Sequence, residues 1–260
     1  MYLSDLEMFV ASIAIVPLFR LISASVSSPV SGLPPVSALD AIIFDLDGTI
    51  LDTAEELCGA IAVARNTILP DLPPLSGAAI LADHPRLFGG TLEEFHETLI
   101  PPSHHDYDRF VQLFLDAVKI APPSPAFSDV VPALARLRSS HPTLKFGVAT
   151  TKPTKAAEGD LKARSVPASL RGYFSHVQGT DSGMSAKPAP DVILASAAGL
   201  GVDPSRAIYI GDTQRDHLAA KRAGCAYSVL VRRGDEGNED RLGAEVLVRS
   251  FLEIEEKCKN

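Results

Sequence analysis

The chain has 260 residues, of which 46% are hydrophobic and 22% are charged, a composition that excludes wholesale disorder and collagen-like or coiled-coil proteins. Its 24 Lys and Arg residues face 32 Asp and Glu residues, a net charge of −8, so no cationic surplus points to nucleic acid as a partner. Cys58, Cys225 and Cys258 lie far apart and show neither metal-ligand spacing nor a disulfide pattern. We therefore expect a reducing compartment and a cytoplasmic location.

The first 38 residues differ from the rest and are expected to form a poorly ordered N-terminal extension. Their apolar run at 8–19 is interrupted by Pro17 and is shorter than the roughly 18 residues that a membrane-spanning helix requires. We therefore expect no stable insertion into a membrane. A secretory signal peptide normally has Lys or Arg before its apolar segment, whereas none precedes this run. A Ser/Pro-rich linker follows at 23–37. A targeting or membrane-surface role of this segment stays open.

An apolar run at 41–44 predicts a buried strand that leads into the polar turn 45–49. Beyond this turn, the chain up to residue 125 has helical patterns and prolines but no clear strand. Thr53 and Glu56 have the spacing of a capping box at a helix start. Apolar periodicity predicts helices over about 53–68, from about 91, and over about 106–119.

After residue 125, predicted strands and helices alternate. The strands are expected at 145–149, 176–178, 207–210 and 227–231. One helix is expected over about 129–139, and a second follows the strand at 145–149 and ends at about 164. Three more are expected from 190 to Gly199, from about 216 to Gly224, and over 251–257, where the glycines mark helix ends. This alternation predicts the α/β class, with a Rossmann-like parallel sheet covered by helices on both faces. The sheet domain would be discontinuous, 39–56 plus 126–260, with an α-helical domain inserted at 57–125.

Polar side chains follow three of the predicted strands, at the point where each strand ends. They are Asp45 and Asp47, then Thr150, Thr151 and Lys152, then Asp212 and Asp216, and Lys187 lies just before the helix at 190. Ligands bind at the edge where the carboxyl ends of parallel strands meet, so we expect these side chains to converge. Carboxylates held close together need a cation, and an oxygen-only set favours Mg²⁺ over zinc. The metal and the ammonium would together hold a phosphate dianion.

These residues resemble the four motifs of the haloacid dehalogenase superfamily of Mg²⁺-dependent phosphohydrolases. The matching segments are Asp45-Leu46-Asp47-Gly48-Thr49, Thr150, Lys187, and Gly211-Asp212-Thr213 with Asp216, in that order and in fitting strand contexts. The stretch 187–191 and the helical insert after the first motif resemble the phosphoglycolate phosphatase-like branch, in which the insert is a cap domain. The resemblance covers about residues 39–250 and implies hydrolysis of a small phosphorylated metabolite through an aspartyl-phosphate.

The resemblance also implies roles for individual residues. Asp45 would be the nucleophile, and Asp47 the acid that protonates the leaving oxygen and then the base that accepts a proton from water. Thr150 and Lys187 would stabilise the transferring phosphate, with Gly48, Thr49, Thr151 and the cap-loop residue Gly90 contacting substrate. The metal set would be Asp45, Asp47 (through its backbone carbonyl), Asp212 and Asp216, the last of which orients waters or Lys187 more readily than it ligates.

Simpler interpretations compete for two of these residues. Asp216 could be a solvated acid in the first turn of a helix, as probable as a role in the site. Lys152 reads as a surface lysine at a helix start rather than as a catalytic group.

Other functions within this superfamily fit less well. Dehalogenases lack an acid two residues after the nucleophile, where this chain has Asp47. Sugar-phosphate mutases have a His where Leu57 stands, and phosphonate hydrolysis needs a cap lysine, whereas 57–118 contains none. A catalytically inactive interaction protein with the same fold stays open as a different class of function, although every motif residue is present.

Overall fold

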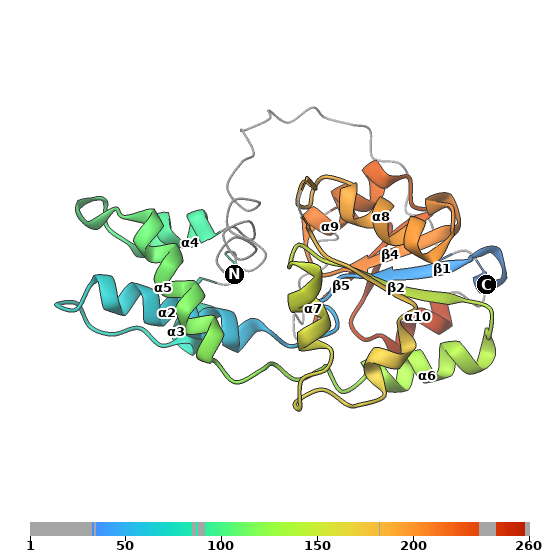
Figure 1. Ribbon diagram of the computed structural model, residues 1–260, viewed down its shortest axis with the longest axis horizontal. Coiled ribbons are helices and arrows are strands. Elements are labelled where there is room, and N and C mark those ends of the chain that lie inside the picture. Colours follow the sequence, from blue (N-terminus) through green and yellow to red (C-terminus); the bar gives the residue numbers. More distant parts are fainter. Residues whose placement is uncertain are drawn as a thin grey trace.

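The computed structural model describes residues 33, 35–84, 87, 92–181, 183–233 and 243–257. Its centre is a six-stranded parallel sheet with the strand order β3-β2-β1-β4-β5-β6 (Figure 1). The strands are β1 (Ala41–Phe44), β2 (Lys145–Ala149), β3 (His176–Gln178), β4 (Ala207–Gly211), β5 (Tyr227–Val231) and β6 (Val246–Val248). The predicted α/β fold with a parallel sheet is confirmed, and β6 is a strand that the sequence pattern did not predict.

Helices cover both faces of this sheet, as Figure 1 shows. They are α6 (Val130–Ser140), α7 (Thr154–Asp160), α8 (Asp191–Leu200), α9 (Gln214–Ala223) and α10 (Leu252–Lys257). β1 is buried along its whole length. Ile42 and Phe44 belong to the apolar cluster that contains α6 and α10, while Ala41 and Ile43 belong to the cluster that contains α8 and α9. This two-sided burial explains why β1 is a continuous apolar run rather than an alternating one.

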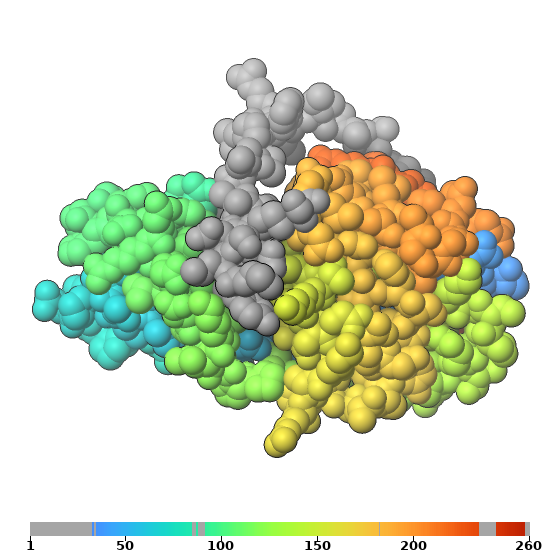
Figure 2. Space-filling model, viewed as in Figure 1, coloured from blue at the N-terminus to red at the C-terminus, as the bar shows by residue number. Residues whose placement is uncertain are grey.

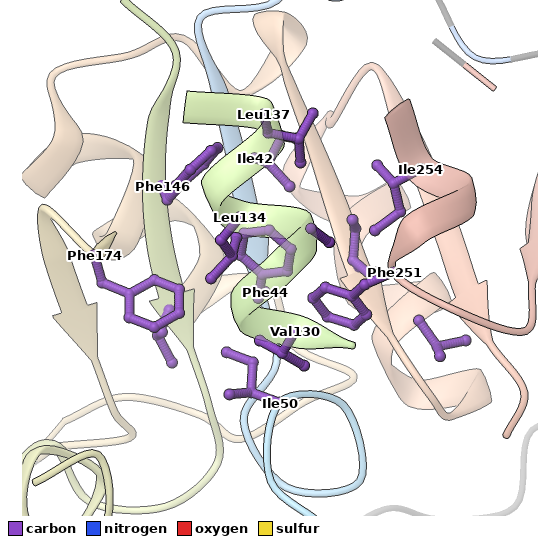
Figure 3. Packing of buried hydrophobic residues seen from close by; sticks show 14 of the residues in the cluster. Ile42, Phe44, Ile50, Val130, Leu134, Leu137, Phe146, Phe174, Phe251 and Ile254 are labelled. Atoms are coloured by element: carbon purple, nitrogen blue, oxygen red, sulfur yellow. The ribbon is translucent and has the colours of Figure 1, made fainter. Parts of the chain in front are cut away.

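The end of β1 is fixed by aromatic packing. Phe44 stacks on Phe251, with ring centroids 5.4 Å apart, and meets Phe146 and Phe174 edge to face, each at 6.1 Å. Figure 3 shows these rings packed with Leu134 and its neighbours on α6. Such contacts hold the backbone rigidly because they combine large apolar burial with preferred ring geometry. The residue that follows Phe44 is therefore presented from a fixed position.

Four helices lie outside this sheet layer, namely α2 (Ala54–Ile68), α3 (Gly77–Asp83), α4 (Leu92–Leu99) and α5 (Tyr107–Ile120). Figures 1 and 2 show them as a lobe beside the sheet, coloured blue to green. They share an apolar cluster of their own, with Phe110, Phe114 and Ile61 at its centre. The chain enters and leaves this lobe through adjacent segments, since Asp52 N donates to Pro125 O at 2.9 Å.

Several local predictions differ from the structure. The Thr53 side chain makes no capping hydrogen bond, and its backbone (φ −90°, ψ 0°) lacks the extended conformation of a capping residue. The Glu56 carboxylate instead accepts a hydrogen bond from Ser124 across the entrance to the lobe. Helix α3 was not predicted, and α7 ends at Asp160 rather than near 164. Helix α8 passes through Gly199 and ends at Gly201, whose φ of 65° places it in the left-handed region where helices terminate.

The described part of the predicted N-terminal extension packs on the sheet domain. Leu33 and Val36 are 3% and 5% exposed and belong to the same apolar cluster as Phe44. Leu33 N also donates to Lys257 O at 3.1 Å. The packed part of the chain thus begins before residue 39. Among the described residues, no helix is both long and apolar enough to cross a membrane.

Candidate active site

The predicted site residues lie at the carboxyl ends of β1, β2 and β4. The register pairs Phe44 at the end of β1 with Ile210 of β4, and Asp45 N donates to Ile210 O at 2.8 Å. Asp45 and Asp212 therefore leave neighbouring strands at the same edge. Thr150 follows β2 and is held there by its N–H, which donates to Gln178 O at 3.0 Å. These side chains converge because β2, β1 and β4 are neighbouring parallel strands whose carboxyl ends lie at the same edge of the sheet.

A buried ammonium joins two of these carboxylates. Lys187 Nζ donates to Asp45 Oδ1 and to Asp216 Oδ1, both at 2.6 Å, and to the Tyr209 hydroxyl at 3.1 Å. The three side chains that form the ion pairs are between 3% and 8% exposed. Tyr209 in turn donates to Ala149 O at 2.8 Å. All three N–H donors of Lys187 are thus occupied, which fixes the position of its charge beside Asp45.

Asp216 is held in place from both of its oxygens. While Oδ1 accepts from Lys187, Oδ2 accepts from the Thr213 hydroxyl at 2.6 Å and from Thr213 N at 3.0 Å. Thr213 and Asp216 form a capping box that starts α9. Asp216 is 2% exposed, so the interpretation as a solvated acid is wrong. Its bonds instead suit a residue that orients Lys187, because little acceptor capacity is left for a metal ion.

Glycines allow the backbone to approach these carboxylates closely. Gly48 has a φ of 75°, and a β-carbon there would clash with the Asp212 carboxylate. A β-carbon on Gly211 would likewise clash with the side chain of Asp216. Thr49 Oγ1 donates to Asp212 Oδ1 at 3.4 Å, a long bond. The motif glycines are therefore required by close packing at the site as well as by the turn.

The acidic residues carry more negative charge than one lysine balances. Burial, with a further contribution from Asp216 against the opposing effect of Lys187, raises the pKa of Asp45 to about 7. Burial and the neighbouring Asp216 and Asp45 carboxylates raise the pKa of Asp212 well above its ordinary value. The pKa of Asp216 is lowered, because its bonds from Lys187 and Thr213 outweigh the effect of burial. The raised pKa values show that Asp45 and Asp212 lack sufficient positive charge beside them, which favours the binding of a cation there.

The donor set fits a divalent metal ion. Among the described residues, Asp45, Asp212 and Asp216 each offer a carboxylate oxygen, and these atoms lie within 4.8 Å of one another. Oxygen-only sets suit Mg²⁺, which usually binds one or two protein carboxylates and keeps several waters. Asp45 and Asp212 are the carboxylates with acceptor capacity to spare, whereas the Asp47 carboxylate lies outside this set.

Asp47 instead forms an ion pair with Lys152. Lys152 Nζ lies 2.9 Å from Asp47 Oδ1 and 2.5 Å from Asp160 Oδ2. The side chain of Lys152 is 17% exposed, so the prediction of a surface lysine is wrong. The attraction of Asp47 and Asp160 outweighs burial and raises the pKa of Lys152, which keeps its ammonium charged.

The predicted phosphate-binding residues differ in their surroundings. Thr150 is 1% exposed, and its hydroxyl accepts a hydrogen bond from Lys152 N at 3.2 Å, which leaves its O–H free to donate. Thr151 is partly exposed beside it. Gly90 lies outside the described residues. Tyr209, Thr213 and Lys152 were missed as site residues, and the available signals were a tyrosine inside an apolar strand and the Thr-x-x-Asp spacing at 213–216.

Comparisons with known proteins agree with this geometry. The model of the haloacid dehalogenase-like hydrolase family matches residues 42–230. A phosphoglycolate phosphatase of Caulobacter vibrioides is 35% identical over 223 residues, which cover 84% of this chain and 90% of that protein. An N-acetylmuramic acid 6-phosphate phosphatase of Pseudomonas aeruginosa is 30% identical over 219 residues, covering 81% of this chain and 90% of that protein.

A solved structure shows the same fold. A haloacid dehalogenase-like family hydrolase from Streptococcus pneumoniae superposes with a TM-score of 0.67 at 23% identity, covering 84% of this chain and 97% of that one. The family match spans most of the chain and includes all four motifs. The chain therefore belongs to the haloacid dehalogenase-like hydrolase family and is an enzyme of that family.

Proposed function

We propose that the protein is a Mg²⁺-dependent phosphatase that hydrolyses a small phosphomonoester through an aspartyl-phosphate on Asp45. The observation that carries this proposal is the buried cluster at the end of β1, in which Asp45 lies 2.6 Å from Lys187 and next to the metal-binding candidate Asp212. The names of the relatives, phosphatases for phosphoglycolate and for N-acetylmuramic acid 6-phosphate, support a phosphomonoester as the substrate.

In the first step, a carboxylate oxygen of Asp45 attacks phosphorus, and the bond between phosphorus and the leaving oxygen breaks. Asp47 donates its proton to that oxygen, so the alcohol leaves neutral. The Thr150 hydroxyl donates to a phosphate oxygen, and the charge of Lys187, fixed beside Asp45, stabilises the negative charge that accumulates on the phosphate. Mg²⁺, held by Asp45, Asp212 and the Asp47 carbonyl, would supply the positive charge that lets an anionic nucleophile approach an anionic phosphate.

In the second step, Asp47 accepts a proton from a water molecule, whose oxygen attacks the phosphorus of the aspartyl-phosphate. The acyl–phosphate P–O bond breaks, inorganic phosphate leaves, and the Asp45 carboxylate is restored. Asp47 ends the cycle protonated, ready for the next substrate. Asp216 contributes by fixing Lys187, and Tyr209 by accepting the third N–H of the same ammonium.

We further propose that the four helices between residues 54 and 120 are a cap that closes over the site. Their separate apolar core and the paired segments at residues 52 and 125 support a lobe that moves as a unit. Closure would exclude bulk water and select small phosphorylated metabolites over large phosphoproteins.

We also propose a cytoplasmic location. The spacing of the cysteines supports it, and Cys58 and Cys225 are free thiols. Fractionation tests the proposal, because recovery of the protein with membranes or in an oxidising compartment would contradict it.

The proposed function is tested by phosphate release from a panel of phosphorylated metabolites, with native protein and Asp45→Asn compared in Mg²⁺ and in EDTA. We expect release by the native protein with Mg²⁺, and loss of release in EDTA and in the variant. Full activity of Asp45→Asn would overturn the mechanism, and activity on no phosphomonoester would favour the interaction protein.

A further inference from the structure

Lys152 occupies a position between two carboxylates that its place in the sequence did not suggest. Its ammonium donates to Asp47 Oδ1 at 2.9 Å and to Asp160 Oδ2 at 2.5 Å, across sequence separations of 105 and 8 residues. Asp47 and Asp160 keep 24% and 38% of their side-chain surface exposed, whereas Lys152 keeps 17%. Lys152 is thus the most buried of these three side chains.

The backbone of Lys152 is also fixed. Its N–H donates to the Thr150 hydroxyl at 3.2 Å, and its carbonyl accepts from Thr180 N at 3.1 Å. A β-carbon on Gly179 would clash with that carbonyl, so this close approach requires a glycine. The loop after β2 is therefore clamped to the loop after β3, and the lysine projects from a rigid base.

Asp47 needs such a support. It lies in the turn after β1, and among the described residues Lys152 is the side chain that donates to its carboxylate. A carboxylate that must first donate and then accept a proton works only if it is held within hydrogen-bond reach of the reacting oxygen. A bond to Oδ1 restrains rotation of the side chain and leaves Oδ2 available to the substrate.

We propose that Lys152 is the positioning residue of the acid–base catalyst Asp47: by fixing Oδ1 it aims Oδ2 at the leaving oxygen, while Asp160 anchors the lysine itself. This inference rests on the proposed function, because it assigns Lys152 a part in the same reaction. Lys152 acts through Asp47 and does not touch the phosphorus or the nucleophile. Its own proton stays on the ammonium throughout, and the proton transferred to the leaving alcohol comes from Asp47.

The test compares two substrates that need proton donation to different extents. An alkyl phosphate expels a basic alkoxide and depends on the acid, whereas p-nitrophenyl phosphate expels a stable phenolate and hardly needs one. The ratio kcat/KM reports the steps up to release of the first product. We expect Lys152→Met to lower kcat/KM for the alkyl phosphate by about tenfold to a hundredfold, and for p-nitrophenyl phosphate by less than about threefold.

Two further variants separate positioning from a general structural effect. In an Asp47→Asn background, adding Lys152→Met should change kcat/KM for the alkyl phosphate by less than about twofold, because the residue it positions is already disabled. Lys152→Arg, which keeps a donor to Asp47, should retain most of the native kcat/KM for the alkyl phosphate. Lys162→Met is the matched control, because Lys162 is a 63% exposed lysine that pairs with Glu158 rather than with Asp47 or Asp160. Lys152→Leu, which also lacks a donor, is measured alongside with the same expected losses, in case the methionine variant does not fold.

Equal losses for both substrates would overturn the assignment and leave the proposed function intact. An undiminished effect of Lys152→Met in the Asp47→Asn background would do the same, since it would show that Lys152 acts elsewhere, for example on a substrate anion. A native protein that releases no phosphate from either substrate overturns the proposed function, and the assignment with it.

Discussion

Replacing Lys187 with methionine would expose how much of the site's stability depends on one buried charge. The Lys187 side chain is 5% exposed, and its ammonium lies 2.6 Å from both Asp45 and Asp216. Methionine fills a similar volume but leaves these carboxylates, and Asp212 beside them, without a cation from the protein. Breaking a buried ion pair by removing one partner costs about 3–5 kcal/mol, so we expect a loss of that size in the free energy of unfolding at neutral pH without Mg²⁺.

The loss should depend on pH in a direction that the pKa shifts fix. In the native protein, burial already raises the pKa of Asp45 to about 7 and raises that of Asp212 well above its ordinary value. Without Lys187, the pKa of Asp216 should also rise above its value in the unfolded chain. A folded state with raised carboxyl pKa values binds more protons than the unfolded state, so its stability falls as pH increases through those values. The variant should therefore approach the native stability in acid and diverge from it as pH rises.

The assay is urea unfolding followed by far-ultraviolet circular dichroism, in EDTA, at about pH 5 and about pH 8. Lys162→Met removes an exposed lysine and should stay within about 0.5 kcal/mol of the native protein at both values. Addition of Mg²⁺ should recover part of the loss at the higher pH, because the ion replaces the missing positive charge. A loss below about 1 kcal/mol, or one that is equal at both pH values, would refute this account of the site's electrostatics.

Three other substitutions test neighbouring parts of the structure. Tyr209→Phe removes the hydroxyl that accepts the third N–H of the buried ammonium, and should lower the free energy of unfolding by about 1–3 kcal/mol in urea melts; an unchanged melt would contradict the network. Gly48→Ala forces a β-carbon onto Asp212 and should weaken Mg²⁺ binding about tenfold by isothermal titration calorimetry, whereas native affinity would show that the carboxylate can move aside. Burial raises the pKa of Asp129, but hydrogen bonds from groups that include Arg233 lower it below its usual range. Asp129→Ala should therefore cost about 1–3 kcal/mol at neutral pH, and since a lowered pKa stabilises the fold only while the acid is ionised, this difference should shrink below about pH 4.

The sheet was predictable wherever a strand is a fully buried apolar run between polar turns. The strand at 41–44 meets that condition, and so does 145–149 apart from the exposed Lys145 at its start; the structure has both with those bounds. β6 has only three residues, Val246–Val248, and α3 has seven, Gly77–Asp83, so neither is long enough to show a clear period. Their existence depends on β5 and α2, against which they pack.

Helix starts show why local spacing alone is ambiguous. Thr53 and Thr213 are each followed by an acid three residues later, yet only Thr213 caps its helix. The Glu56 carboxylate accepts a hydrogen bond from Ser124, which is 68 residues distant in sequence, whereas the Asp216 carboxylate accepts one from the Thr213 hydroxyl. Tertiary partners decide between the two outcomes.

The motifs led to Asp45, Lys187, Asp212 and Asp216 because strand ends in a parallel sheet converge at one edge. The partners of Lys152 were not accessible in this way. Its ion pair with Asp47 spans 105 residues and depends on how the loop after β2 is clamped against Gly179. A lysine beside a helix start gives no local signal of such a pair.

In the proposed reaction, Asp45 becomes phosphorylated during turnover. Rapid acid quenching of the protein during hydrolysis of a phosphomonoester with Mg²⁺, followed by peptide mass spectrometry, would detect this phosphorylated aspartate. We predict the added mass of one phosphoryl group on the peptide that contains Asp45, and none in EDTA or in Asp45→Asn. A phosphoryl group on another residue, or steady turnover with no phosphorylated protein at any quench time while Asp45→Asn remains active, would contradict the claim.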